Sequence, residues 1–413
     1  MTSFGDDPSV DFGGLVRREP AVVHAPATTD ELVACMRALA AAGTPYKLRG
    51  AAHSASGEVL SDGGAVIDLR RLAGVVADDP AREQVTALAG TTWLALWEHL
   101  AAQGRRPLTL TDNPRVTLGG TLACGGVGDA SHLVGPQVAG VVRAVLVTPD
   151  GARHALARGE PLLDHALCSH GQLGVLAEVT LATRRASSTV HGRLVQWGSL
   201  AAHLDDVAAL RHDYVRGRVV WTEGLVRAVA FVACSEPAAE LPVPRDAIAT
   251  SETVAIDMLD RMRGDPSALY PAFNPCIEVA LPYPAALPAL QQLDTLLARS
   301  ALLRWLPRGS SLALVAGTRG LPLSPFASER NVLLAVRPEA PTLADAQACE
   351  PVLRAIADLA LAAGGRVYLA SFQLAADALA RQLGAAGPAL AQLRRAVDPG
   401  GLCNRGSLHG WQP

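Results

Sequence analysis

The chain has 413 residues, of which 49% are hydrophobic and 18% are charged. This composition is typical of a globular protein, and the length is sufficient for two domains. A formal net charge of −3 and the absence of any basic tract give no reason to expect a nucleic-acid partner. No apolar run reaches membrane-spanning length, and the first residues lack the basic and apolar regions of a signal peptide, so we expect a cytoplasmic protein without a membrane partner.

Seven cysteines are scattered along the chain without a CxxC pair, which favours reduced core cysteines. The histidines and cysteines show no metal-ligand spacing, so the sequence predicts no metal site. The 36 basic residues include one lysine, Lys47, and alanine is heavily used. We interpret this bias as that of a GC-rich bacterial genome.

The first half of the chain predicts strands, helices and turns in an irregular order. Periodicity and capping residues predict a strand and a helix over 20–45 and a strand–loop–strand unit over 44–69. Further along, the expected elements are a strand at 84–90, a helix at 92–103, a hairpin at 141–156 and a glycine turn into a strand at 171–181.

From about residue 185, strand candidates alternate with Ala/Leu-rich helices. The strands are expected at 189–197, 219–234, 276–281, 311–315 and 331–336, and the helices at 198–211, 284–299, 344–363 and 388–397. This alternation predicts an α+β architecture, with an antiparallel sheet that carries helices on one face.

Two segments of small residues stand out as candidate binding loops. The loop from Arg49 to Ser56 contains one imidazole, His53, among glycine, alanine and serine. Between residues 118 and 137 glycine is too frequent for a regular helix or strand, and the spacing is not that of a Rossmann turn. Bare backbone can face the negative charges of a large ligand, although such loops also occur for structural reasons alone.

The order of these motifs resembles that of the FAD-linked oxidases of the vanillyl-alcohol-oxidase (PCMH) superfamily, and of cytokinin dehydrogenase in particular. Arg49-Gly50-Ala51-Ala52-His53-Ser54 is similar to the family's R-G-x-G-H-S loop. Thr111-Asp112 and the segment from Thr117 to Leu122 match its T-D and T-V-G-G-T-L motifs. Further matches are Gly135-Pro136-Gln137, Gly171-Gln172-Leu173-Gly174, Glu223-Gly224 and Asp398-Pro399.

The resemblance implies a two-subdomain FAD-binding domain formed by residues 1–188 and 374–413. An α+β substrate-binding domain would comprise residues 189–373. The implied cofactor is FAD, attached covalently through His53. Asn113 occupies the position at which relatives with a second, cysteinyl link carry cysteine, so a single link is expected.

The implied cofactor contacts come from the small-residue segments and the end of the chain. They are His53, Arg49, Gly50, Ala51, Ala52, Ser54, Gly57, Thr111, Thr117, Gly119, Gly120, Thr121, Gly125, Gly128, Gly174, Val175 and Ser407. The substrate would contact Trp221, Tyr368 and Gln373. His132 and His170, which lie beside the glycine segments, are interpreted as loop histidines.

The implied reaction is oxidation of a C–N or C–O bond of a small molecule by hydride transfer to flavin N5. Asp112 would be the base, as the matching family aspartate is, and Glu223 would tune it. Oxygen or a quinone would be the electron acceptor, and the substrate would be a cytokinin-like amine or a secondary metabolite. The oligomeric state is not predicted.

Other interpretations are open from the residues alone. His53 could form hydrogen bonds without a covalent link, Asp112 could be a turn residue, and Glu223 could face solvent. FAD could also be partly structural in a non-redox cyclase, or the protein could bind ligands without a flavin.

Overall fold

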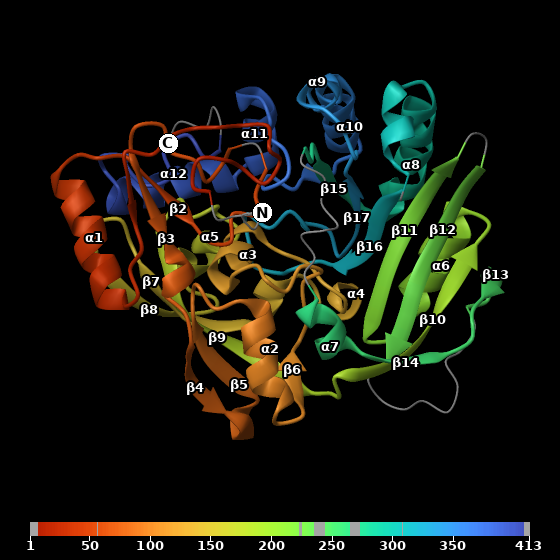
Figure 1. Cartoon of the computed structure of the whole chain (residues 1–413), viewed down its shortest axis with the longest axis horizontal. Coiled ribbons are helices and arrows are strands. Elements are labelled where there is room, and N and C mark those ends of the chain that lie inside the picture. Colours follow the sequence, from red (N-terminus) through yellow and green to blue (C-terminus); the bar gives the residue numbers. More distant parts are fainter. Residues whose placement is uncertain are drawn as a thin grey trace.

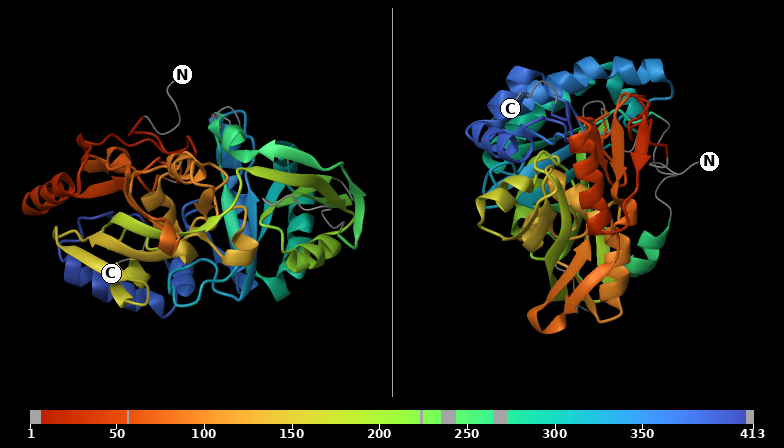
Figure 2. Two further views of the ribbon diagram at one scale, coloured as in Figure 1. Left: turned by 90° about the horizontal axis from the view of Figure 1, so that it is seen from below. Right: turned by 90° about the vertical axis from the view of Figure 1, so that its left-hand side faces the viewer.

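Three β-sheets organise the computed structural model, which describes residues 7–55, 57–222, 225–234, 244–264, 273–307 and 309–408 (Figure 1). Two sheets are formed by the first half of the chain and the third by the second half. The N-terminal sheets and the large sheet occupy opposite ends of the long axis of the molecule (Figure 2). The predicted α+β architecture is confirmed.

The smallest sheet is parallel and contains β1 (Val22–His24), β3 (Ala65–Asp68) and β2 (Tyr46–Arg49) in this order. Helix α1 (Thr29–Ala41) begins where the Thr28 hydroxyl accepts a hydrogen bond from the Glu31 backbone N–H, and it buries Leu32 and Met36 against these strands. The C-terminal segment returns to β2. Cys403 forms a parallel bridge with Tyr46, and the Asn404 side chain accepts a hydrogen bond from the Leu48 N–H at 2.8 Å.

The second sheet is antiparallel, with the order β4-β5-β9-β7-β8 and β6 paired with β9. Its strands are β4 (Val75–Asp79), β5 (Gln84–Leu88), β6 (Arg105–Pro107), β7 (Val141–Val147), β8 (Arg153–Ala157) and β9 (Val175–Arg185). The predicted hairpin is the β7–β8 pair.

The third sheet has nine strands in the order β13-β10-β12-β11-β16-β17-β15-β18, with β14 paired with β10, and every pair is antiparallel. Its strands are β10 (Thr189–Trp197), β11 (Tyr214–Thr222), β12 (Leu225–Cys234), β13 (Ala247–Thr250), β14 (Val254–Asp257), β15 (Ile277–Pro282), β16 (Ser310–Ala316), β17 (Arg330–Val336) and β18 (Arg366–Val367). The single strand predicted at 219–234 was wrong, because this segment belongs to the hairpin β11–β12.

Alternation along the strands gives the large sheet two different faces. Ile277, Val279 and Leu281 of β15 are buried in the core that includes residues of α8 (Tyr283–Ala298) and α10 (Glu350–Ala362). Between them, Glu278 points to the other face, which borders a cavity. The helices therefore cover one face and leave the other available for a ligand.

The remaining helices connect and cover the sheets. They are α2 (Trp93–Ala101), α3 (Leu118–Cys124), α4 (Ser131–Val134), α5 (Pro161–Ala166), α6 (Leu200–Ala209), α7 (Met258–Arg263), α9 (Leu343–Ala348), α11 (Ala376–Leu383) and α12 (Ala386–Val397). The helix predicted at 344–363 is divided into α9 and α10, and Pro351 lies in the first turn of α10, where proline is favoured. None of the described helices is long and apolar enough to span a bilayer.

Helix α3 corrects the prediction that the glycine-rich segment has no regular structure. Gly119 lies so close to β5 and the turn after it that an added Cβ would be 3.0 Å from the Ala89 Cβ. The helix ends at Gly125, which has a φ of +80°. Glycine therefore permits close packing of a short helix.

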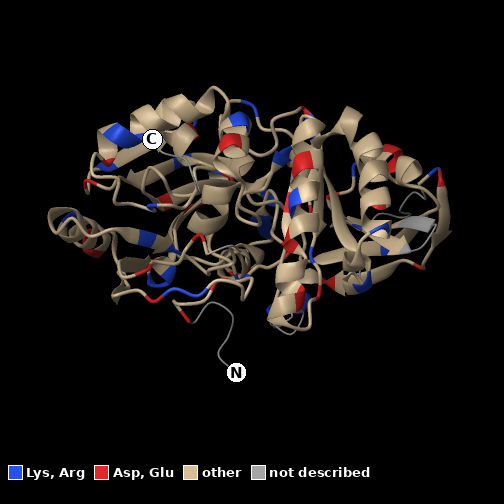
Figure 3. Ribbon diagram, turned by 90° about the horizontal axis from the view of Figure 1, so that it is seen from above, with Lys and Arg blue, Asp and Glu red and all other residues tan. Residues whose placement is uncertain are grey.

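Basic and acidic residues are interspersed over the described ribbon (Figure 3).

Candidate active site

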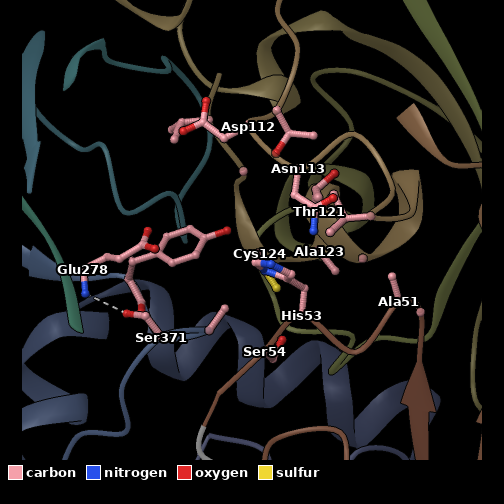
Figure 4. A pocket seen from close by; sticks show the side chains of 18 of the residues that line it. Ala51, His53, Ser54, Asp112, Asn113, Thr121, Ala123, Cys124, Glu278 and Ser371 are labelled. Atoms are coloured by element: carbon pink, nitrogen blue, oxygen red, sulfur yellow. Dashed lines mark hydrogen bonds between the residues drawn. The ribbon is translucent and has the colours of Figure 1, made fainter. Parts of the chain in front are cut away.

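A cavity of about 500 Å³ lies between the N-terminal sheets and the open face of the nine-stranded sheet, and this volume is within the usual range for small-molecule sites. One wall comes from the loops after β2, before and along α3, and before β9. The opposite wall comes from β11, β12, β15, β16 and β17. In the view of Figure 4, Glu278 and Ser371 lie at one side of the pocket, Ala51 at the other, and His53 between them.

Most of the predicted site residues line this cavity. They are Arg49, Gly50, Ala51, Ala52, His53, Ser54, Thr111, Asp112, Thr117, Gly119, Gly120, Thr121, Gly128, Gly174, Val175, Tyr368 and Ser407. Gly57, Gly125, Trp221 and Gln373 do not line it, and Glu223 lies outside the described residues.

His53 is partly buried, and its ring centroid lies 3.9 Å from that of Phe12. Burial, followed by the nearby positive charge of Arg337, lowers the pKa of His53 to about 3. The imidazole is therefore neutral at pH 7, and one of its ring nitrogens carries no proton.

Asp112 lies at the mouth of the cavity, with 68% of its side chain exposed. Its Oδ1 is 3.1 Å from the Arg216 Nη2 on β11, so the ion pair joins the two walls. A carboxylate held in this way can accept a proton from a ligand in the cavity.

The buried carboxylate of Asp129 fixes the segment that leads to Asp112. It accepts hydrogen bonds from the Leu110 N–H at 3.0 Å and the Thr109 hydroxyl at 3.2 Å, and it pairs with buried Arg106. The Asp129 backbone carbonyl also accepts a hydrogen bond from the Val215 N–H at 3.0 Å, next to Arg216. One residue thus positions both partners of the Asp112–Arg216 pair.

A second ion pair on the nine-stranded sheet was missed by the sequence analysis. Buried Glu278 pairs with Arg337, and the Glu278 N–H donates to the Ser371 hydroxyl at 2.8 Å (Figure 4). Burial, Cys124 and Glu278 raise the pKa of the neighbouring Tyr368 well above its ordinary value, so its hydroxyl is a proton donor. The alternation of β15 could have indicated that Glu278 faces away from the helices.

The two histidines interpreted as loop residues differ in their surroundings. His132 is not among the described residues that line the cavity. Its Nε2 lies 2.8 Å from the carbonyl oxygen of His212. His170 is buried at the cavity wall, with Nδ1 2.5 Å from Glu58 Oε1 and 3.8 Å from Cys124 Sγ. Burial lowers the pKa of His170, but Glu58 and Cys124 more than offset this effect and raise it well above 6.5.

Comparison with known proteins agrees with this geometry. Residues 20–157 match the family model described as an FAD binding domain. The chain is 31% identical over 225 residues to "Uncharacterized oxidoreductase ORF5 in fasciation locus" of Rhodococcoides fascians, which covers 53% of this chain and 50% of the relative. It is 30% identical over 227 residues to cytokinin dehydrogenase 7 of Oryza sativa subsp. japonica, a match that covers 51% of this chain and 43% of the relative. It is 29% identical over 232 residues to cytokinin dehydrogenase 1 of the same species, with 53% of this chain and 43% of the relative covered.

The resemblance to the FAD-linked oxidases of the PCMH type, and among them to cytokinin dehydrogenase, is confirmed. The FAD-binding domain match contains the small-residue loop with His53, Asp112 and helix α3. The chain spans about half the length of the curated relatives that it matches.

The residues of the cavity fit an FAD group. Gly50 packs so closely against Thr117 that a Cβ added to Gly50 would be 2.3 Å from the Thr117 Oγ1. A Cβ added to Gly120 would be 3.0 Å from the same Oγ1 and would otherwise point into open space. Bare backbone therefore borders the cavity where the two glycine segments meet. Among the described lining residues, five arginines and three carboxylates give an excess of positive charge that complements a pyrophosphate.

Trp221 and Gln373 are not brought to the cavity. Trp221 is buried on the helix-covered face of the nine-stranded sheet, and its Nε1 donates to the Ser310 hydroxyl at 2.8 Å. Arg216 and Arg218, at the alternate positions of β11, line the cavity instead. The period of two along a strand explains why the aromatic residue points away from the site.

Ala52 has a φ of +55°, in the left-handed region, at the position where the family motif has glycine. We expect Ala52→Gly to stabilise the protein by roughly 0.5–1 kcal/mol, because relief of this strain exceeds the entropy that glycine adds to the unfolded chain. Urea unfolding measures the change. Ala51→Gly is the matched control, since Ala51 is not in the left-handed region and the substitution should destabilise. Destabilisation by both substitutions would contradict the prediction.

Proposed function

We propose that this chain is an FAD-dependent oxidoreductase that oxidises a C–N or C–O bond of a small molecule, with Asp112 as the base. The observation that carries the proposal is the Asp112–Arg216 pair, which spans the mouth of a cavity containing a neutral His53. The similarity to cytokinin dehydrogenases makes a secondary amine the first substrate class to test.

Bound FAD would supply the hydride acceptor of the reaction. Two segments would hold the FAD: the small-residue loop that contains His53 and the backbone around Gly119 and Gly120. His53 would be the single point of covalent attachment. Oxygen or a quinone would then reoxidise it. Residues 1–188 and 374–413 would form the FAD-binding domain, and residues 189–373 the substrate-binding domain.

The chain's own residues would handle the proton. Asp112 would accept a proton from the N–H or O–H group of the substrate, which requires its carboxylate to be ionised. The guanidinium of Arg216 fixes the direction of the oxygen that it contacts. Glu223 is proposed to tune Asp112 on the strength of the family resemblance alone.

Anaerobic mixing of the flavin-loaded protein with cytokinin-like secondary amines tests the proposal. We expect one substrate of this class to bleach the visible absorbance of the flavin in a single turnover, because reduction removes the oxidised chromophore. Consumption of a substrate without bleaching would contradict an oxidoreductase and support a non-redox cyclisation. A protein that is purified colourless and takes up no FAD would exclude both.

A further inference from the structure

Three side chains of different chemistry meet on the wall of the cavity. Glu58 comes from the loop after β2, Cys124 from the end of α3, and His170 from the segment before β9. One ligand atom of each residue lies within 4.8 Å of the other two. The Nδ1 of His170 is 2.5 Å from Glu58 Oε1 and 3.8 Å from Cys124 Sγ.

The Glu58 carboxylate is incompletely satisfied in this position. The residue is 8% exposed, and its Oε1 contacts His170. Its Oε2 is buried and has no hydrogen-bond partner among the described residues. A buried carboxylate oxygen without a partner is costly, and a bound cation would remove this cost.

The lysine of β2 does not supply the missing partner of Glu58 Oε2. The ammonium group of Lys47 donates instead to the Ser407 hydroxyl at 2.7 Å. It thus leaves Glu58 Oε2 unbound.

Binding would release the protons of the His170 Nδ1 and the Cys124 thiol to solvent. The resulting donor set of one imidazole nitrogen, one thiolate sulfur and one carboxylate oxygen is one that zinc accepts. For tetrahedral zinc, the Zn–N and Zn–S distances place the nitrogen and sulfur roughly 3.5 Å apart. The observed separation of 3.8 Å between His170 Nδ1 and Cys124 Sγ is close to this value. Glu58 Oε1 would have to move away from Nδ1 by roughly 0.9 Å, which rotation of its side chain can provide.

We propose that Glu58, Cys124 and His170 bind a divalent cation of the zinc class, with the fourth coordination position facing the cavity. The inference is independent of the proposed oxidation, since it depends only on these three side chains. It also differs from the sequence prediction of no metal, because the ligands come from three distant segments and have no characteristic spacing.

Metal analysis of the flavin-loaded protein tests this proposal. After dialysis against a chelator and titration with zinc alone, mass spectrometry should find about one zinc per chain, with the flavin content unchanged. Cys124→Ser, His170→Gln and Glu58→Gln should each weaken zinc binding by at least about 100-fold, the upper end of the range for loss of an outer-shell partner. Replacement of zinc by cobalt gives a second measurement. The difference spectrum of the unmodified protein should show a sulfur-to-cobalt charge-transfer band, and that of Cys124→Ser should not.

Cys276→Ser is the matched control, because Cys276 is a buried cysteine that lines the same cavity outside the cluster. It should bind zinc as the unmodified protein does. The thermal unfolding midpoint of each variant shows whether it is folded. Failure of the unmodified protein to bind stoichiometric zinc, unchanged binding by folded Cys124→Ser, or binding only after removal of the flavin would overturn the proposal.

Discussion

Replacement of His53 by alanine is expected to release the flavin from the protein. After acid precipitation, the unmodified protein should keep its yellow colour in the pellet, and the His53→Ala variant should lose it to the supernatant. The reason is that the neutral imidazole of His53, with a pKa of about 3, is the proposed point of covalent attachment, and its neighbours in the loop are alanine and serine. Absorbance of the two fractions measures the outcome.

The control for this experiment is His132→Ala. His132 is not among the residues that line the cavity, so this variant should keep its flavin in the pellet. A yellow supernatant from the unmodified protein would end the proposal of a covalent link. A colourless supernatant and a yellow pellet from His53→Ala would assign the link to another residue.

Replacement of Asp112 by asparagine is expected to lower the rate of flavin reduction by about 10²-fold or more, the range for loss of a general base. Asparagine preserves the size of the side chain but cannot accept the substrate proton. Anaerobic stopped-flow measurement of the flavin absorbance gives this rate directly. Asp62→Asn changes an exposed carboxylate that does not line the cavity and should leave the rate unchanged.

Arg216→Gln separates the role of the base from that of its partner. This variant keeps the carboxylate but removes the ion pair that crosses the mouth of the cavity. We expect a smaller loss of rate than in Asp112→Asn, because the carboxylate that accepts the proton remains. An unchanged reduction rate in Asp112→Asn would remove Asp112 from the mechanism.

Local patterns predicted many elements of the fold and several segments that line the cavity. The strand–helix unit of β1 and α1, the β7–β8 hairpin and the loop with His53 follow from periodicity, turn residues and small side chains in consecutive positions. These features depend on neighbours in the sequence, which is why the sequence alone was sufficient.

Features that depend on distant contacts were not predicted. Nothing near Asp112 in the sequence indicates Arg216, because the pair forms only when β11 approaches the loop that precedes α3. The orientation of Trp221 depends on which face of the sheet the helices cover, and the helical state of Gly119 depends on its contact with Ala89. The cluster of Glu58, Cys124 and His170 likewise joins three separate segments.

The return of the C-terminal segment to β2 has a consequence for biosynthesis. Asn404 and Ser407 bond to Leu48 and Lys47 across more than 350 residues of chain, and both of them line the cavity. During translation Asn404 and Ser407 emerge from the ribosome only after the strands of the nine-stranded sheet, so the edge of the N-terminal sheet and the ammonium group of Lys47 lack these partners until then. Loading of a cofactor into the cavity is therefore expected to follow the emergence of Asn404 and Ser407, and chaperones that shield exposed strands would protect the chain until then.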